Sequence, residues 1–347
     1  MARIIELGGD DASIGAQYGE QARPEIHAVV DYYETLFTGL PEAVGDALRR
    51  HAEKLTERIH TLTPHLARQI EATADAAGVD RAALFRVNAR SELFAFAIPE
   101  CTAIYSPASA HLAQNWDFGP DLLERTVLLR IELEDGRRLM TLTEAGMLGK
   151  IGLNADGIGV CLNMLVSNAR VDGLPIHVLL RWLLEARSRE EVETRLKTVG
   201  HGRIGNVLIG STEGWGINME FGGASFRRDD VHDRNFVHTN HLLEATASEV
   251  DFVHNSIMRF DQAHAQSGPD RGLDFGALDA ILSDRSNAEH PIHVPVRTLG
   301  GMTFGTLYTV IMDLPARTLH LRKGQDPAVA YETHAVVGPP PASSGVA

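Results

Sequence analysis

The pattern of the chain changes from helical to strand-like at Pro99-Glu100-Cys101-Thr102-Ala103-Ile104-Tyr105. Before it, apolar residues recur at the three- and four-residue steps of amphipathic helices; after it, short strand-like runs alternate with turns. Cys101 stands at the start of the first such run, and Gln114-Asn115-Trp116-Asp117 ends the second run. The sequence therefore predicts a helical part, a sheet-rich part and a thiol at the boundary between them.

The N-terminal part is predicted to be helical throughout. Its apolar residues favour one amphipathic helix over residues 15–37, and further helices are expected over 42–61, from Pro64 to Gly78, and over 81–96. Thr63-Pro64 is typical of an N-cap followed by proline in the first turn. We therefore expect four helices in residues 1–100.

The C-terminal part is predicted to consist of hairpins with helices grouped between them. Asp135-Gly136 and Asp156-Gly157 are tight-turn signals between strand-like runs, and a third hairpin is expected over residues 206–220. Helices are expected over 175–186, 189–198, 251–266 and 275–283, and a last strand pair over 307–321. This order indicates an α+β fold with two stacked antiparallel sheets covered by helices. The Pro/Gly/Ser-rich residues 338–347 are expected to form a disordered tail.

The composition excludes several classes of protein. The net charge of −14 would repel a phosphate-rich polymer, so nucleic-acid binding is not expected. No apolar run approaches the roughly 18 residues that a membrane span requires. Two cysteines, Cys101 and Cys161, do not make a disulfide framework, and we expect a cytoplasmic protein whose thiols are reduced.

Cys101 is the candidate nucleophile. A free thiol, with a pKa of about 8.5, is mostly protonated at neutral pH and needs a base. That base could be a histidine, or the α-amino group that Cys101 would gain if the chain were cut after Glu100. An α-amino group has a pKa of about 7.7–8.0, which suits a general base. The residues alone leave both options open.

Five segments in order resemble one known family. They are Gly15-Ala16-Gln17-Tyr18-Gly19, the stretch from Cys101 to Tyr105, Gln114-Asn115-Trp116-Asp117, the stretch from Gly152 to Val160, and His238-Thr239-Asn240-His241. Together they resemble the acyl-coenzyme A:6-aminopenicillanic acid acyltransferase (isopenicillin N acyltransferase) family. That family is the C45 peptidase-like branch of the N-terminal nucleophile (Ntn) hydrolases.

The resemblance implies an αββα sandwich and self-cleavage between Glu100 and Cys101. Residues 1–100 would form a helical fragment and residues 101–337 the catalytic part. Cys101 would attack an amide or thioester and carry the acyl group, Asp117 would orient the new α-amino group, and Asn240 would donate to the oxyanion. Asn154 is a weaker candidate for the oxyanion site, and Asn115 and Arg297 are candidates for oxyanion or substrate contacts.

The expected substrate is a small N-acyl amide or acyl thioester, with acyl-coenzyme A allowed as donor. No cofactor is expected, and His238 and His241 alone are too few ligands for a metal site. The two fragments are expected to stay associated, because the helix over residues 15–37 needs a partner for its apolar face. Two alternatives remain: an uncut hydrolase that pairs Cys101 with a histidine such as His241, and a degenerate, non-catalytic binding protein of the same fold.

Overall fold

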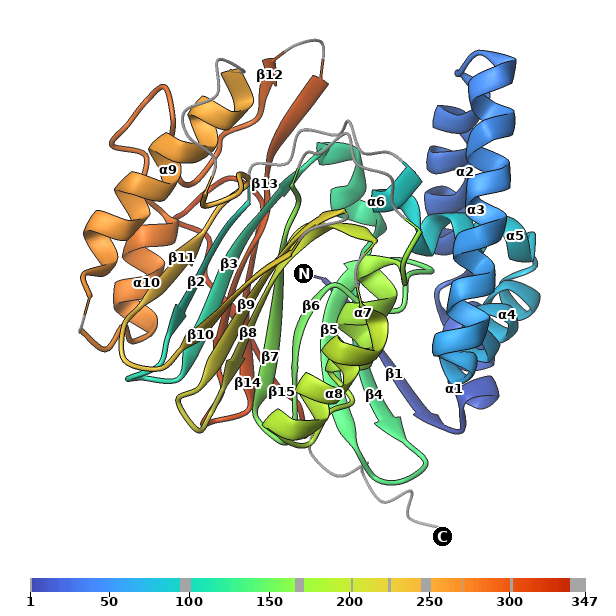
Figure 1. The fold of residues 1–347 in the computed structure, drawn as a ribbon, viewed down its shortest axis with the longest axis horizontal. Coiled ribbons are helices and arrows are strands. Elements are labelled where there is room, and N and C mark those ends of the chain that lie inside the picture. Colours follow the sequence, from blue (N-terminus) through green and yellow to red (C-terminus); the bar gives the residue numbers. More distant parts are fainter. Residues whose placement is uncertain are drawn as a thin grey trace, which may run out of the picture.

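A computed structural model shows two β-sheets that face each other between layers of helices (Figure 1). It describes residues 2–93, 101–165, 172–200, 202–223, 226–244, 251–269, 271–299 and 302–337. The predicted tail over residues 338–347 lies outside these ranges. None of the described helices is both long and apolar enough to cross a membrane.

The first sheet has eight strands in the order β1-β4-β5-β6-β7-β8-β9-β10. All neighbours are antiparallel except β1, which pairs parallel to β4. The strands are β1 (Arg3–Gly9), β4 (Thr126–Leu133), β5 (Arg138–Glu144), β6 (Ile151–Asn154), β7 (Ile158–Asn163), β8 (Arg203–Ser211), β9 (Gly216–Gly223) and β10 (Phe226–Val231).

The second sheet has seven strands. Its order is β11-β2-β3-β13-β14-β15, with β12 paired to β13. The strands are β2 (Thr102–Ser106), β3 (His111–Phe118), β11 (Phe236–His238), β12 (Arg297–Leu299), β13 (Met302–Asp313), β14 (Thr318–Lys323) and β15 (Glu332–Ala335). β2 and β3, which carry Cys101 and the Asn115–Asp117 motif at their ends, are therefore central strands next to each other.

Helices cover the outer face of each sheet. The first sheet is covered by α1 (Asp11–Gln21), α2 (Arg23–Thr38), α3 (Glu42–Leu62), α4 (Pro64–Ala77), α5 (Arg81–Asn88), α6 (Arg90–Leu93), α7 (Ile176–Leu183) and α8 (Arg189–Val199). The second sheet is covered by α9 (Asp251–Ser267) and α10 (Phe275–Leu282). A short 3-10 helix, η1 (Pro120–Arg125), links β3 to β4.

Three apolar clusters follow this layering. One lies between the N-terminal helices and the first sheet, a second between the two sheets, and a third between the second sheet and α9 and α10. Gln114 ties the sheets together across the second cluster: its Oε1 accepts from Leu162 N at 3.0 Å and its Nε2 donates to Leu162 O at 2.5 Å. The predicted α+β fold with two stacked sheets between helix layers is confirmed.

The helical N-terminal part differs from the prediction in three ways. One is that the helix expected over 81–96 is divided at Ala89 into α5 and α6, so the described residues of this part hold six helices where four were expected. The single helix expected over residues 15–37 is wrong: it is divided into α1 and α2 at Ala22, because Pro24 has no N–H to continue the hydrogen-bond ladder. Arg3–Gly9 is a strand, not part of a helical segment, and it joins the sheet of the C-terminal part. Residues 1–100 are therefore not purely helical. Of the helix expected over 81–96, the last residues lie outside the described ranges.

The expected hairpins are present. Gly136 and Gly157 have φ of 81° and 83°, the left-handed values that the two predicted Asp-Gly turns require. The sequence did not predict β10, β12 or β15, which are an exposed sheet edge, a short strand and a C-terminal edge strand. Apolar and polar residues alternate only weakly in these strands, because few of their side chains are buried between layers.

Candidate active site

Cys101 lies directly before β2, at the inner face of the second sheet. The β2–β3 register pairs Thr102 with Asn115, so Cys101 stands opposite Trp116, and both side chains belong to the cluster between the sheets. Cys101 is 3% exposed, and its Sγ donates a weak hydrogen bond to the carbonyl oxygen of Asp117 at 3.9 Å. The structure thus brings the predicted nucleophile and Asp117 together.

Arg259 of α9 connects the nucleophile to the predicted oxyanion residue. Its Nη1 donates to Cys101 O at 2.8 Å and to Thr102 Oγ1 at 3.0 Å, and its Nη2 donates to Asn240 Oδ1 at 3.0 Å. Asn255, one turn earlier on the helix, accepts from Arg259 Nε at 2.8 Å. The guanidinium is fully buried, and its fixed fork of donors suits this bridging position.

The same contact fixes the orientation of Asn240. Because Oδ1 faces the Arg259 guanidinium, the Nδ2 group points the other way, where one hydrogen is donated to Met164 O at 2.9 Å. Ser256 Oγ accepts from Asn240 N at 2.7 Å and holds the backbone. An amide nitrogen has two hydrogens, so Asn240 keeps a second donor for an oxygen anion.

The thiol of Cys101 is not ionised by this environment alone. Burial raises its pKa to about 11, and the negative charge of Asp117 acts in the same direction. Lys150 and Arg259 lower the pKa of Cys101 through their positive charges. In the uncut chain the thiol therefore needs help to form a thiolate.

Lys150 belongs to a buried network of charges beside the nucleophile. It lies directly before β6, and its Nζ lies 3.6 Å from the centre of the Trp116 ring and 3.3 Å from Glu144 Oε1. Glu144, at the end of β5, also accepts from Arg90 Nη2 at 2.5 Å and from Tyr33 OH at 2.6 Å. Burial, strengthened by the like charge of Arg90, lowers the pKa of Lys150 to about 7.

The histidines of the predicted His238-Thr239-Asn240-His241 motif have other partners. His238 Nε2 lies 2.7 Å from Glu220 Oε1 in a buried pair. His241 Nδ1 lies 2.9 Å from Ser256 Oγ, and burial lowers its pKa to about 4. These contacts tie both rings to the β11 region and do not favour the pairing of Cys101 with His241.

Three predicted contact residues lie elsewhere. Asn154 faces α7 on the outer side of the first sheet: its Nδ2 donates to Leu184 O and Ala186 O, and its Oδ1 accepts from Ile158 N. Asn115 faces the α10 side of the second sheet, where its Nδ2 donates to the carbonyls of Leu282 and Ile292. In the described structure these amides hold turns and loops, and their assignment to the oxyanion or substrate stays a prediction.

Arg297, the third of these residues, lies on β12. Its Nη1 donates to Glu289 O at 2.8 Å, and its guanidinium stacks over the Phe304 ring. Its substrate role stays a prediction. Glu100, the other half of the expected cleavage site, lies outside the described residues.

Sequence reasoning missed Arg259, Lys150, Glu144 and Arg90. A signal for Arg259 was present: Asn255, Ser256 and Arg259 occupy positions of the predicted helix on the same face as Ala263, where apolar side chains are expected. Polar residues on the core face of a helix indicate a buried polar site. No comparable local pattern marks Lys150 or Glu144.

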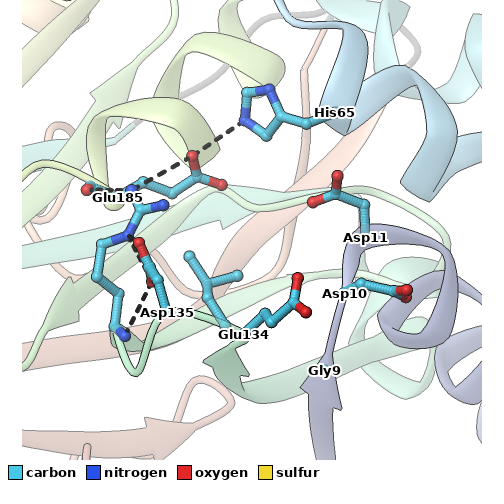
Figure 2. A pocket seen from close by; sticks show the side chains of 9 residues that line it. Gly9, Asp10, Asp11, His65, Glu134, Asp135 and Glu185 are labelled. Carbon is cyan, nitrogen blue, oxygen red and sulfur yellow. Dashed lines mark hydrogen bonds and ion pairs between the residues drawn. The ribbon is translucent and has the colours of Figure 1, made fainter.

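A pocket of about 410 Å³ lies at the far end of β5 from Glu144 (Figure 2). It is bounded by the β1–α1 junction, the turn between β4 and β5, and Glu185, and His65 Nε2 approaches Glu185 Oε2 to 3.0 Å. Its carboxylates come from Asp10, Asp11, Glu134, Asp135 and Glu185. In the described part of the chain no three His, Cys, Asp or Glu side chains are arranged to hold a metal ion.

Comparisons with known proteins identify the family of this chain. A sequence profile of the family "Acyl-coenzyme A:6-aminopenicillanic acid acyl-transferase" matches residues 106–327, beginning five residues after Cys101. The acyl-coenzyme A:6-aminopenicillanic-acid-acyltransferase 40 kDa form of Emericella nidulans is 28% identical over 335 residues, which is 92% of either chain.

Two solved structures are similar to this chain at low sequence identity. Penicillin V acylase from Agrobacterium tumefaciens is 12% identical, with a TM-score of 0.44 over 66% of this chain and 84% of the other. A C2A mutant of conjugated bile acid hydrolase from Clostridium perfringens is 13% identical, with a TM-score of 0.42 over 68% of this chain and 92% of the other.

Two facing sheets between helical layers, with a buried thiol where a central strand begins, define an enzyme-like αββα sandwich. Within that class, the profile match over most of the chain decides the assignment. The chain belongs to the acyl-coenzyme A:6-aminopenicillanic acid acyltransferase family.

Proposed function

We propose that the protein is a self-processing N-terminal-cysteine amide hydrolase or acyltransferase. The chain would be cut between Glu100 and Cys101, and Cys101 would then carry the acyl group of a small N-acyl amide or acyl thioester as a thioester. The carrying observation is the Arg259 bridge, because one buried guanidinium holds both the nucleophile's carbonyl and the amide of Asn240.

The proposed reaction has two stages, self-cleavage and turnover. In the uncut chain the thiol attacks the Glu100 carbonyl carbon, the C–N bond breaks, and the amide nitrogen takes a proton to become the α-amino group of Cys101. Water then hydrolyses the Glu100 thioester and frees the thiol. In turnover the neutral amine accepts the thiol proton, the thiolate attacks the acyl donor, and Asn240 donates to the oxyanion.

The position of Asp117 supports its role in this scheme. Its carbonyl oxygen already accepts from the Cys101 thiol, and its side chain is close enough to raise the pKa of that thiol. A carboxylate here would hold the new ammonium group by charge and hydrogen bonding. Because both fragments contribute strands to one sheet, through β1 and β4, they would stay associated after the cut.

The relatives support these substrate classes. The similar protein from Emericella nidulans is an acyl-coenzyme A:6-aminopenicillanic-acid acyltransferase, and the two solved structures are a penicillin V acylase and a conjugated bile acid hydrolase. The shared acyl–heteroatom bond makes amides and acyl-coenzyme A the donors to screen first.

The deciding experiment is the denatured intact mass of freshly purified wild type beside Cys101→Ala. We expect two fragments for wild type, with the break between Glu100 and Cys101, and one full-length chain for Cys101→Ala. One uncut wild-type chain would remove the α-amino base from the mechanism. If an electrophilic acyl analogue still labels Cys101 in such a chain, the protein is an uncut thiol hydrolase. If no label is found, the protein is a non-catalytic binding protein.

A further inference from the structure

Lys150 is a buried cation on the same side of the second sheet as the nucleophile. Cys101 and Trp116 are opposite each other on neighbouring strands, and the Lys150 Nζ lies over the Trp116 ring at 3.6 Å. The Phe118 ring, two residues further along β3, lies 5.6 Å from the same nitrogen. Lys150 is 3% exposed, so few water molecules screen its charge from the thiol.

The charges around Lys150 do not cancel. Arg90 and Lys150 are two cations, and Glu144 is the one carboxylate that contacts both, at 2.5 Å and 3.3 Å. With Lys150 protonated the cluster carries an excess positive charge next to Cys101. A thiolate at Cys101 would balance that charge, and the two groups do affect each other: each favours the charged form of the other.

We propose that Lys150 is the electrostatic partner that promotes ionisation of the Cys101 thiol in the uncut chain. This inference rests on the proposed function, and it assigns Lys150 to the step for which that mechanism has no base. Before the cut there is no α-amino group, and the described histidine contacts do not reach the thiol. A protonated amine that packs over Trp116, the residue opposite Cys101, stabilises the thiolate by charge, so the attack on Glu100 begins from a larger thiolate fraction.

The N-terminal fragment contributes residues to the charge network beside Cys101. Tyr33 and Arg90 belong to that fragment, whereas Glu144 and Lys150 belong to the part that follows Cys101. Arg90 and Tyr33 occupy the oxygens of Glu144 and keep it from neutralising Lys150 completely. The charge beside the nucleophile is therefore built from both sides of the cleavage point.

The test measures ionisation of Cys101 directly. Asn240→Ala, which removes the oxyanion donor and slows cutting, serves as the background, and Lys150→Met and Lys150→Arg are added to it. Cys101 is alkylated with iodoacetamide from pH 6 to 10, and mass-spectrometric peptide mapping follows the uncut peptide that spans Glu100 and Cys101. This peptide reports the uncut chain separately from the cut chain and from Cys161.

Few other groups change charge in this pH window. The groups that face Lys150 or Cys101 are Arg90, Glu144, Tyr33, His177, Asp117, Arg259 and Cys161. Burial lowers the pKa of His177 well below its usual value and raises those of Tyr33 and Cys161 well above theirs. The pH dependence of alkylation therefore reports chiefly on Lys150 and Cys101.

We expect Lys150→Met to raise the apparent pKa of Cys101 by about one unit, and to slow alkylation at pH 7.5 about tenfold. Lys150→Arg should retain most of the wild-type profile. Arg322→Met is the matched control, because it removes a cation that is 1% exposed and paired to Asp279 on the far face of the second sheet. It should leave the profile unchanged.

An unchanged profile for Lys150→Met, with an unchanged melting temperature, would overturn the proposal. If Lys150→Met does not fold, the polar replacement Lys150→Gln decides: it removes the positive charge, so it should raise the apparent pKa of Cys101, and an unchanged or lower value would refute the inference. If no variant is ever cut, self-processing fails as a function, while the alkylation profile still decides whether Lys150 and Cys101 are coupled.

Discussion

Replacing Arg259 by Met would test the geometry of the site most directly. Methionine is of similar length and has no donor, so Cys101 O, Thr102 Oγ1 and Asn240 Oδ1 would lose the hydrogen bonds that the guanidinium gives them. The position is fully buried, so water cannot replace the donor without opening the space between α9 and β2. Asn240 would be free to rotate its amide away from the reacting carbonyl.

The contacts of Arg259 set the expected size of the loss in stability and of the loss in acyl-transfer rate. Three buried acceptors without a donor, at about 1–2 kcal/mol each, give a loss of about 3–6 kcal/mol in the free energy of unfolding. At about 2 °C per kcal/mol for a chain of this size, the melting temperature should fall by about 6–12 °C. Misplacing a single oxyanion donor should slow acyl transfer about 100- to 1,000-fold.

The assay compares wild type, Arg259→Met, Arg259→Lys and Arg322→Met at a temperature well below all four melting points. The rate of cutting after Glu100 is followed by intact mass, and kcat and KM are measured on a hydrolysable acyl amide. We expect Arg259→Lys to recover part of kcat, since it keeps the charge but not the fork of donors. Arg322→Met should lose stability with kcat retained.

One result would refute the reasoning. If Arg259→Met is cut and turns over at the wild-type rate, Arg259 does not orient Asn240, whatever happens to the melting temperature. If kcat falls by the same factor in Arg259→Met and in Arg322→Met, Arg259 has only a structural role.

Two further predictions concern the fold around the site. Gly152→Ala should destabilise the protein by more than about 2 kcal/mol, because a Cβ there would lie 2.1 Å from Met140 O in the neighbouring strand. Gly276→Ala in α10 is the control: the atom nearest to its added Cβ would be 3.6 Å away, so this change should be neutral or stabilising. Thermal denaturation measures both. Burial raises the pKa of Glu92 to about 7 from 4.5, so its protonated form is favoured in the folded state and stability falls as the pH rises from about 4.5 to about 7. Glu92→Gln keeps the acceptor for Ile176 N. Its free energy of unfolding, measured by urea denaturation, should therefore equal that of wild type near pH 4.5 and exceed it by about 2–3 kcal/mol at pH 8. Equal stability of the two proteins at both pH values would contradict this.

Local signals were enough for much of the fold. Alternating apolar residues and the Asp-Gly turns at Gly136 and Gly157 predicted the central hairpins, since a strand's side-chain period and a tight turn depend on residues a few positions apart. The parallel pairing of β1 with β4 joins residues more than a hundred positions apart. No short-range pattern encodes such a pairing, so Arg3–Gly9 was taken as part of a helical segment.

The sequence by itself determined which thiol to consider and which motif residues accompany it. Cys101, Asp117 and Asn240 were identified from their positions in short motifs, and the structure brings them to one place. Only the tertiary structure decided what surrounds them. Arg259 reaches Cys101 from 158 positions away, and Lys150 and Glu144 meet Arg90 and Tyr33 between layers.

The tertiary structure also decided which way the other candidate amides face. Asn154 and Asn115 occupy motifs as conspicuous as that of Asn240, yet each faces the outer side of its sheet and holds carbonyls of a turn or loop. Which face of a sheet a side chain occupies follows from strand register, and its charge state follows from burial and neighbours. Both are properties of the packed chain, and this is why residue type and spacing alone could not assign them.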